Sequence, residues 1–536
     1  MATIAVLGTL DTKGAEHQYV AECIQRIGHR SLLLDVGFGG APRVTPDVSR
    51  ERILEMAGGT PGDRFGDKDS GMAAMVAALP KALLSLYQDH QIQGVISVGG
   101  ECGTEIATAG MRALPLGFPK VMVTPLSGTD MARYVGFRDI LLFPSLADVF
   151  GLNRLLRATL AQAAGVVCGM IEFSANISTV GEKPLVVAST TPHCAAGIDR
   201  AIAVVEGAGY EVLRIPSDGS GGRSLEAIVD SGLAAGVLDM SLREWTDEVL
   251  GGPCGAGPTR LEAAALNGVP AVVVPGGVDL AMVPEDPSVL SKWRERTFYK
   301  LNTKTRWMRS DAAECEKIGR KIAEKLNLST GPVSVLLPVR GISALSSPGK
   351  PFHDPEADRA LFRGIRENLS KEISVKELKA TISDAAFAEA CARALLGNIK
   401  AKARDFENLQ KVEFFEGESE AFLRQLARLL HTEVFLPNDF IIRQDEVGDC
   451  MYFLASGSAE VLNNGHRVAK LGSGAPFGEM ALVSGERRNA SVRAMEYCEV
   501  HRLEREDFGM LRTNYPAFDM RVKAIVKQRI MSNLHT

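Results

Sequence analysis

FGEMALVSGERRNASV, residues 477–492, is the stretch of this sequence that decides the fold of its C-terminal part. The glycines of such a stretch let the backbone approach a ligand closely, and inward N–H groups can then hold a small anion. Arg488 offers a guanidinium for exocyclic phosphate oxygens, and Glu479 offers a carboxylate for a sugar hydroxyl. Together these groups predict a site for a cyclic phosphodiester that carries a ribose.

The stretch closely resembles the phosphate-binding cassette of cyclic-nucleotide-binding domains, the superfamily of the catabolite activator and the protein kinase regulatory subunits. The family pattern runs F-G-E-x-A-L, a short gap, then R-x-A-[TS]-V, and the register matches here without a gap. The resemblance implies that Glu479 accepts the ribose 2′-OH and that Arg488 clamps the phosphate. The other cyclic-nucleotide residues that it implies are Gly478, Met480, Ala481, Asn489, Ala490 and Ser491.

Residue Asn489 bears on the choice of base, because cGMP-selective members often carry Thr there and cAMP-type members often carry Ala or Ser. The preference therefore stays open, with cAMP favoured over cGMP. Upstream, alternating apolar residues and turn glycines over 440–457 predict a β jelly-roll. The alternative is a barrel that has lost its ligand, but a degenerate site rarely keeps both Glu479 and Arg488.

Composition sets the general class of the protein. The chain has 536 residues, 46% of them hydrophobic and 23% charged, with a formal net charge of -5, which predicts a globular protein of several domains. The acidic balance argues against a nucleic-acid surface built on bulk charge. The apolar strand runs are too short to span a bilayer, and the N-terminus lacks a basic leader, so we expect a cytoplasmic protein. The nine scattered cysteines contain no Cys-x-x-Cys pair, so neither a disulfide framework nor a metal site is expected.

The rest of the chain reads as short apolar strands alternating with helices, the pattern of parallel α/β sheets. The expected fold is α/β, with two Rossmann-like parallel-sheet subdomains followed by a C-terminal jelly-roll. The expected boundaries are 1–181 for the N-terminal nucleotide-binding subdomain, 182–398 for the second, 399–417 for a linker and 418–536 for the cyclic-nucleotide-binding domain. A single helix predicted over 518–531 leaves no room for a DNA-reading helix-turn-helix after the barrel.

Three loops rich in Gly, Ser and Thr, over 8–14, 99–104 and 217–223, follow predicted strands. Ligands of open parallel sheets bind at such strand ends, where helix N-termini present unpaired N–H groups. We expect these loops to bind ATP, with Lys13 and Arg223 near phosphate oxygens and Asp11 and Asp218 orienting Mg²⁺ or hydroxyls. Helix capping is the alternative role. The expected ATP residues are Gly8, Thr9, Asp11, Thr12, Lys13, Gly99, Gly100, Gly103, Thr104, Ser127, Gly128, Gly221, Gly222 and Arg223.

Residues 1 to about 398 also resemble the Tm-one-like ATP-binding family, named for a plant tobamovirus-resistance protein. The matching pieces include VLGTLDTKG at 6–14, MRALP at 111–115, GPTRLEAA at 257–264 and DPEAD at 354–358. The resemblance implies two Rossmann-like subdomains with ATP in the cleft between them, and homo-dimers or larger assemblies. It implies no settled reaction.

This chain departs from that family in three places. The family loop G-G-S-G-G-T carries Glu101 and Cys102 here, which places a carboxylate where phosphate is expected. Two family histidines are replaced by Leu301 and Thr381. If those histidines were catalytic, this member has changed its chemistry; if they packed or capped, nothing is lost. His193 is the remaining imidazole in a candidate loop, although a lone histidine there is more often structural.

No nucleophile elbow, zincin helix or kinase loop set is visible in the sequence. We therefore favour an ATP-binding protein of two subdomains, regulated by a cyclic nucleotide at its C-terminal domain, with small-molecule nucleotides as partners and no membrane or DNA. The alternative is an enzyme that acts on ATP or a phosphorylated or carboxylated metabolite in the interdomain cleft, controlled by the same domain. Fold alone does not separate these hypotheses.

Overall fold

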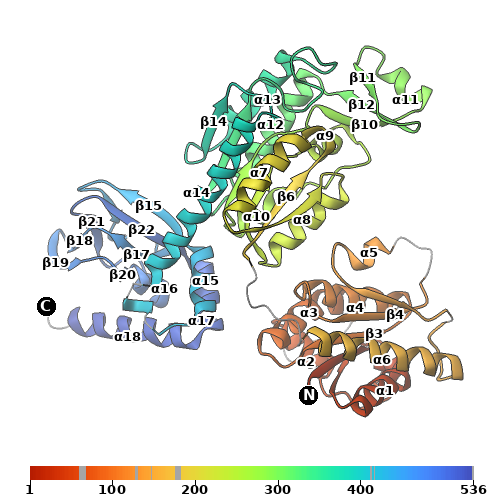
Figure 1. Ribbon diagram of the computed structural model, residues 1–536. Coiled ribbons are helices and arrows are strands. Elements are labelled where there is room, and N and C mark those ends of the chain that lie inside the picture. The colour runs from red at the N-terminus through yellow and green to blue at the C-terminus, as the bar shows by residue number, and fades with distance from the viewer. Residues whose placement is uncertain are drawn as a thin grey trace. The chain divides into compact units, whose positions relative to one another are not determined.

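The structure is a computed structural model that describes residues 1–59, 68–126, 131–146, 148–174, 183–410, 413–415 and 417–533. The chain divides into two compact units, Met1–Glu182 and Lys183–Thr536 (Figure 1). We call them the N-terminal unit and the C-terminal unit and describe each by itself.

The N-terminal unit is built on one parallel sheet with the strand order β2-β1-β3-β4-β5. Its strands are β1 (Thr3–Gly8), β2 (Arg30–Asp35), β3 (Gly94–Val98), β4 (Lys120–Thr124) and β5 (Leu141–Pro144). The order reverses between β1 and β3, and that switch point is where doubly wound sheets bind ligands.

Helices cover both faces of this sheet because successive strand residues point to opposite sides. Ile4 and Val6 of β1 pack in one core cluster, and Ala5 and Leu7 pack in the other. The first cluster includes α1 and α6, and the second includes α3 and α4. The helices are α1 (Leu10–Ile27), α2 (Arg50–Met56), α3 (Lys68–Gln88), α4 (Glu101–Ala113), α5 (Ala132–Val135) and α6 (Arg154–Ser174).

Two of these helices are long and apolar enough to cross a membrane, judged by length and composition over Asp69–Gln88 and Arg154–Ser174. They are longer than the apolar strand runs considered from the sequence. Leu79 of α3 and Leu160 of α6 are fully buried in the two core clusters. Each helix thus covers the sheet with its apolar side, as core helices do.

The C-terminal unit begins with a second parallel sheet, ordered β14-β13-β9-β8-β6-β7. Its strands are β6 (Leu185–Thr190), β7 (Glu211–Pro216), β8 (Ala234–Asp239), β9 (Ala271–Val273), β13 (Val333–Pro338) and β14 (Ser374–Leu378). A small antiparallel sheet, ordered β10-β12-β11, is inserted between β9 and β13. It contains β10 (Leu280–Pro284), β11 (Phe298–Lys300) and β12 (Thr305–Arg309), with α11 (Pro287–Lys292). The two predicted Rossmann-like sheets are therefore confirmed.

The helices α7 and α14 share one core cluster of the second sheet, and α9, α12 and α13 share another. Their bounds, with the remaining helical segments, are η1 (Pro192–Cys194), α7 (Ala195–Gly207), α8 (Ser220–Asp230), α9 (Glu244–Leu250), α10 (Glu262–Leu266), α12 (Ala312–Leu326), α13 (Pro355–Asn368) and α14 (Ala385–Gln410). The helix α14 continues without a break into the stretch expected as a linker from residue 399.

The C-terminal unit ends in two antiparallel four-stranded sheets, ordered β15-β22-β17-β20 and β16-β21-β18-β19, which we call the barrel. This confirms the antiparallel fold predicted for the C-terminal part. Its strands are β15 (His431–Phe435), β16 (Phe440–Ile442), β17 (Cys450–Ser456), β18 (Ala459–Asn463), β19 (His466–Leu471), β20 (Pro476–Phe477), β21 (Ser491–Ala494) and β22 (Cys498–Glu504).

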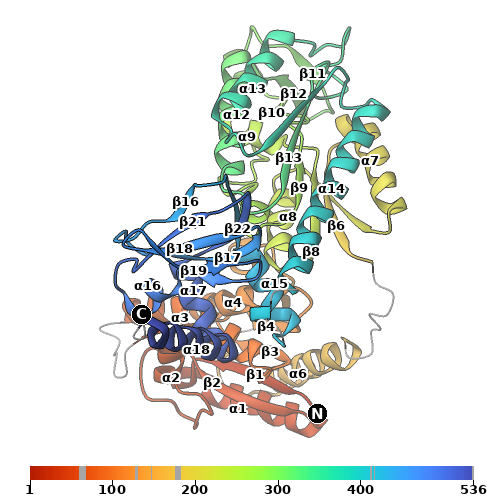
Figure 2. The ribbon, with the colours of Figure 1, turned by 90° about the vertical axis from the view of Figure 1, so that its left-hand side faces the viewer.

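Short helices flank the barrel, and the last of them, α18, packs against α16 and α17 (Figure 2). Phe518 and Val522 of α18 are buried in one aromatic-rich cluster with Phe422 and Phe508. The segments are η2 (Glu413–Phe415), α15 (Glu420–Leu429), α16 (Glu479–Ser484), α17 (Arg505–Asn514) and α18 (Pro516–Asn533). The base of α18 is thus part of the core of the barrel domain.

Candidate functional site

A cavity of about 290 Å³ opens in the barrel between the β18–β19 hairpin, the turn from β20 into α16, and β21. The β18–β19 hairpin lines it mainly with apolar side chains, and the charged groups are Glu479, Arg488 and Arg529. The lining residues are Ile442, Val461, Asn463, Val468, Ala469, Leu471, Phe477, Gly478, Glu479, Met480, Ala481, Arg488, Asn489, Ala490, Val492 and Arg529.

The turn into α16 requires the glycine at position 478. Gly478 has a φ of +86°, a left-handed conformation that other residues adopt at a cost. A Cβ there would also lie 2.9 Å from Nη1 of Arg488 and 3.1 Å from Cδ1 of Ile442. The glycine therefore lets the backbone turn sharply and pass directly beside the guanidinium.

The guanidinium of Arg488 is buried and held by backbone carbonyls. Its Nη1 donates to the carbonyl of Gly478 at 2.7 Å, and its Nη2 donates to the carbonyl of Cys450 at 2.8 Å. Asp449, its acidic neighbour, lies 3.7 Å away and is largely exposed. The positive charge is thus fixed in the cavity wall without a tightly bound internal counter-ion.

The carboxylate of Glu479 is buried and already has a partner. Both of its oxygens lie 2.7 Å from Nη1 of Arg529, on α18. The Nη2 of Arg529 donates to the carbonyl of Pro476 at 2.6 Å. The sequence analysis missed Arg529, because it lies fifty residues from Glu479 in the chain and belongs to no local motif.

Seven of the eight residues expected to bind the cyclic nucleotide line this one cavity. The eighth, Ser491, is not among the lining residues, and its Oγ accepts a hydrogen bond from the N–H of Gln444 at 2.9 Å. The sequence analysis also missed the β18–β19 wall, although the alternating apolar residues of that hairpin, such as Val461, were a usable signal.

A second cavity, of about 350 Å³, lies in the N-terminal unit at the carboxyl ends of β1 and β3. This is the switch point of the sheet, and α1 and α4 both begin there. It brings together six of the residues expected to bind ATP. The lining residues are Thr9, Asp11, Thr12, Lys13, Phe38, Gly39, Gly40, Gly100, Glu101, Cys102 and Gly103.

The charged groups of this cavity are held by neighbours in the same unit. Asp11 accepts a hydrogen bond from the N–H of Gly39 at 2.9 Å, and the ammonium of Lys13 donates to the carbonyl of Val149. Glu101 forms an exposed ion pair with Arg133 at 3.0 Å. The carboxylate that sets this chain apart from the family loop therefore points to a cation of its own unit.

Gly8, Gly99 and Thr104, which are also expected to bind ATP, have structural roles in this unit. A Cβ at Gly8 would lie 2.6 Å from the ring of His17, and one at Gly99 would lie 2.9 Å from the backbone of Gly103. The hydroxyl of Thr104 is buried and bonds the carbonyl of Gly99 at 3.2 Å. Ser127 and Gly128 lie outside the described residues.

The third glycine-rich loop, at the start of α8 in the C-terminal unit, does not offer the open N–H groups that the sequence analysis expected. The N–H groups of Gly219 and Gly222 both donate to Oε1 of Glu244 at 2.9 Å, and that of Gly221 donates to Asp218 at 2.8 Å. The guanidinium of Arg223 donates to the carbonyls of Gly255 and Ala256. ATP binding by Gly221, Gly222 and Arg223 stays a prediction, but a protein carboxylate occupies this turn.

Comparison with known proteins places most of the chain in one family. Residues 2–176 and 183–399 match the models of the N-terminal and C-terminal domains of the uncharacterised protein family UPF0261. The chain belongs to the UPF0261 family. A UPF0261 protein of Clostridium tetani is 37% identical over 396 residues, which cover 73% of this chain and 98% of the relative. One from Rhizobium meliloti is 38% identical over 401 residues, covering 74% and 98%.

The tomato ToMV resistance protein Tm-1(GCR237) is 34% identical over 346 residues, which cover 62% of this chain and 45% of the tomato protein. The resemblance to the Tm-one-like family is thus confirmed. Residues 432–515 match the model of the cyclic nucleotide-binding domain. A solved structure of the regulatory domain of Toxoplasma gondii PKA with cAMP is 29% identical, covers 26% of this chain and 56% of that one, and has a TM-score of 0.24. The family match over residues 432–515 shows that this UPF0261 chain carries a cyclic nucleotide-binding domain in its C-terminal part.

Proposed function

We propose that this UPF0261 chain is an ATP-binding protein regulated by a cyclic nucleotide, cAMP in preference to cGMP, bound in the barrel cavity. The observation that carries the proposal is the convergence of Glu479 and Arg488 on one 290 Å³ cavity. A buried guanidinium without a close internal carboxylate suits a phosphate, because charge-assisted hydrogen bonds are the strong ones. The carboxylate suits a ribose hydroxyl, and the apolar β18–β19 wall suits a base.

The regulatory step follows from the partner of Glu479. A ribose hydroxyl that bonds Glu479 competes with Arg529 for the same carboxylate, so ligand binding acts directly on α18. The C-terminal half of α18, which contains Arg529, can move when this ion pair breaks. Phe518 and Val522 keep the N-terminal half of the helix in the core. Beyond Val522 the helix carries Ile525 and Val526, which are only partly buried. Deleting the whole helix would expose the core, so a point change at Arg529 is the sharper probe.

For ATP we propose the strand-end cavity of the N-terminal unit. Two helices begin at its rim, and helix starts present unpaired N–H groups that favour phosphate. Lys13 lines the cavity as its cation, and Asp11 lines it as an oxygen ligand suited to Mg²⁺. We expect the protein to act in the cytoplasm as a homo-dimer or larger assembly, which light scattering after size-exclusion chromatography tests.

The deciding experiment is calorimetry of the full-length protein with cAMP and cGMP, followed by ATP titrations with and without saturating cyclic nucleotide. We expect cAMP to bind and to shift the ATP affinity by a factor on the order of 5 to 150, with the reciprocal shift of equal size. Heat from neither cyclic nucleotide overturns the barrel proposal. Identical ATP affinities in both titrations reject the coupling.

The ATP site itself is tested by Lys13→Ala, with Arg26→Ala, an exposed change near the other end of α1, as the control. Loss of a phosphate-bonding ammonium is expected to weaken ATP binding about tenfold, since hydrogen bonds to charged groups contribute about 1.5–3 kcal/mol. Equilibrium dialysis in the presence of Mg²⁺ measures it. Equal affinity of wild type and Lys13→Ala places ATP elsewhere.

An enzyme remains the second candidate function. The observation that favours it is a group of buried titratable side chains at the carboxyl edge of the second sheet, namely Asp279, Arg309 and Asp358. This group lies outside both cavities described above.

A further inference from the structure

Four strand-end loops of the second sheet are tied together by their backbones. They follow β6, β8, β9 and β13, which are neighbours in the sheet. The bonds run from the N–H of Ala344 to the carbonyl of His193 at 2.8 Å, from Gly277 to Ile342 at 2.9 Å, and from Leu242 to Gly276 at 2.9 Å. These backbone hydrogen bonds fix the loops that carry His193, Arg243 and Asp279 relative to one another. The loops lie at the sheet edge where ligands of parallel sheets bind.

Gly277 lies at the centre of these loops. Its φ is +72°, and a Cβ built on it would be 3.5 Å from Cβ of Arg243 and 3.6 Å from Cγ2 of Thr191. Thr191 is two residues before His193, and Gly277 is two residues before Asp279. The loops after β6, β8 and β9 therefore meet within side-chain distance of one another.

The carboxyl of Asp279 is fully buried and only half satisfied. Its Oδ2 accepts a hydrogen bond from Oγ of Ser343 at 2.6 Å. Its Oδ1 has no hydrogen-bond partner among the described residues. An unpaired buried acceptor costs about 1–3 kcal/mol, so a further donor at this oxygen would stabilise the protein. Burial raises the pKa of Asp279, and the nearby charge of Arg309 opposes that rise.

The ring of His193 is neutral and presents a defined proton. The indole Nε1 of Trp307 donates to Nε2 of His193 at 2.9 Å. Because an indole N–H can only donate, the neutral imidazole carries its own proton on Nδ1. Burial lowers the pKa of His193, which keeps the ring neutral. Within the described residues Nδ1 has no acceptor, so its N–H is available to donate a hydrogen bond to a ligand.

Arg243 is a buried cation that contacts the same tryptophan. Its guanidinium lies over the ring of Trp307, 5.0 Å from the centroid. Its Nε donates to the carbonyl of Ser217 and its Nη1 to Asp247, both at 3.0 Å. The remaining nitrogen, Nη2, bonds none of the described residues. The loops that meet at Gly277 thus carry unused donors on Arg243 and His193 and an unused acceptor on Asp279.

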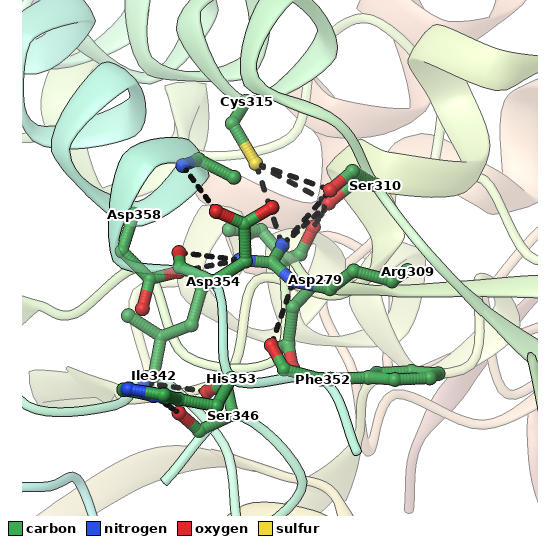
Figure 3. Close-up of polar contacts among 12 residues, drawn as sticks. Asp279, Arg309, Ser310, Cys315, Ile342, Ser346, Phe352, His353, Asp354 and Asp358 are labelled. Atoms are coloured by element: carbon green, nitrogen blue, oxygen red, sulfur yellow. Dashed lines mark hydrogen bonds and ion pairs between the residues drawn. The ribbon is translucent and has the colours of Figure 1, made fainter. Parts of the chain in front are cut away.

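Arg309 is a second buried guanidinium, near enough to Asp279 to oppose the rise of its pKa by burial, and Figure 3 shows its polar contacts. Arg309 donates to Asp358 at 2.6 Å, to the carbonyl of Phe352 at 3.0 Å and to that of Ser310 at 3.1 Å. Burial raises the pKa of Asp358 to about 7, while Arg309 lowers it. Burial thus raises the pKa values of both Asp279 and Asp358, and the charge of Arg309 opposes the rise at each of them.

We propose that this strand edge binds a small 2-hydroxycarboxylate, with Arg243 and the Nδ1–H of His193 on its carboxylate and Oδ1 of Asp279 accepting from its hydroxyl. The guanidinium matches a carboxylate in charge and geometry, and the neutral imidazole adds one N–H donor. The neighbouring hydroxyl is the donor that Asp279 lacks. The site is separate from the barrel and from the strand-end cavity of the N-terminal unit, so it stands without the function proposed above. A buried water on Asp279 is the competing occupant.

The chain supplies its own reporter for the test, because Trp307 contacts both Arg243 and His193. Lactate and glycerate are titrated into the full-length protein, followed by tryptophan fluorescence and by calorimetry. A saturable response with a dissociation constant of about 1 mM or tighter is expected. Trp307→Phe should lose the fluorescence change, which assigns the signal to this tryptophan. No saturable response to either acid up to about 50 mM overturns the proposal in favour of a water.

Variants then assign the contacts. His193→Gln and Arg243→Lys should each weaken binding about tenfold or more, since each removes or shortens a charge-assisted donor. His353→Gln, an exposed imidazole bonded to the carbonyl of Ser346 nearby, is the matched control and should bind as wild type. Unchanged binding in His193→Gln rejects the site. If Arg243→Lys does not fold, the half-buried His193 variant still decides.

The role of the ligand hydroxyl is tested by comparing two ligands on the wild-type protein. Acetate has the carboxylate and lacks the hydroxyl, so it should bind about tenfold more weakly than lactate, the equivalent of one hydrogen bond to a charged group. Equal binding of the two acids rejects the role of Asp279.

Discussion

Two helices of the C-terminal unit begin at a glycine of positive φ, but one of these turns is closed by a protein carboxylate and the other lines a cavity. Gly219 before α8 and Gly478 before α16 both have a φ of +86°. Each turn has one nearly fully buried glutamate, Glu244 or Glu479, and each glutamate has one arginine. A positive φ at the glycine and a buried glutamate with its arginine therefore do not decide whether a turn is open to a ligand.

The two turns differ in which segment supplies the glutamate and in whether the side chain of its arginine partner is buried or exposed. Glu244 comes from another helix, accepts the N–H groups of the α8 turn itself, and bonds Arg260. Arg260 is buried and also pairs with Asp239 at 2.6 Å, so the network is closed to solvent. Glu479 instead lines a cavity, and the side chain of its partner Arg529 is 32% exposed. A closed turn stabilises the fold, whereas a turn whose ion pair reaches solvent can exchange that pair for a ligand.

The largest effect should come from opening the closed turn with Glu244→Ala. Removing this carboxylate leaves two buried N–H groups and part of Arg260 unpaired, which costs about 3–5 kcal/mol of folding free energy. All three tryptophans of the chain, Trp245, Trp293 and Trp307, lie in the second α/β part, so denaturation followed by their fluorescence reports on it.

The control for this change is Glu206→Ala, an exposed glutamate on α7 of the same sheet, for which a change within about 0.5 kcal/mol is expected. A loss below about 1 kcal/mol for Glu244→Ala would show that water replaces the carboxylate easily and that the α8 turn can open after all.

Arg488→Ala should have the next largest effect, on the open turn. Loss of the phosphate-binding guanidinium is expected to weaken cyclic nucleotide binding about a hundredfold or more, or roughly 2–4 kcal/mol. Calorimetry with cAMP measures it. Arg487→Ala, the exposed neighbour that bonds the carbonyl of Asp445, is the matched control and should bind normally. Affinity retained within about tenfold in Arg488→Ala contradicts the phosphate role.

Arg529→Ala should have a smaller effect on the cAMP affinity, and in the opposite direction, than Arg488→Ala. Because the ribose competes with Arg529 for Glu479, its removal is expected to tighten cAMP binding about fivefold, the equivalent of about 1 kcal/mol for a partly exposed ion pair. Lys527→Ala, an exposed cation on the same helix, controls for the change in net charge. Weaker binding in Arg529→Ala means that the arginine contacts the ligand instead of competing with it.

The smallest effect on binding is expected for Ser491→Ala. The Oγ of Ser491 accepts from the N–H of Gln444 and does not line the cavity, so cAMP affinity should change by less than about twofold. The lost hydrogen bond should still lower the stability of the barrel by about 0.5–1.5 kcal/mol. Calorimetry and thermal unfolding of the same variant separate the two quantities, and a large loss of affinity would place the hydroxyl in the site.

Local patterns in the sequence were enough to predict the parallel strands, the antiparallel barrel and the grouping of Gly478, Glu479 and Arg488. Alternation of apolar residues reports which face of a strand is buried, and that depends on neighbours two positions apart. The cassette could be predicted because its ligand groups lie within one short turn-helix-strand segment. The glycine turn at 217–223 was recognised as a turn for the same reason.

What the sequence by itself determined was thus the identity of the elements and the places where the backbone can come close to a ligand. Only the tertiary structure decided which of those places are filled. Glu244 fills the α8 turn from a position 25 residues away from Gly219, and Arg529 covers Glu479 from 50 residues away. His193 meets Trp307 across 114 residues. Such contacts depend on how whole elements pack, and a carboxylate placed by packing looks the same in the sequence as one that faces solvent.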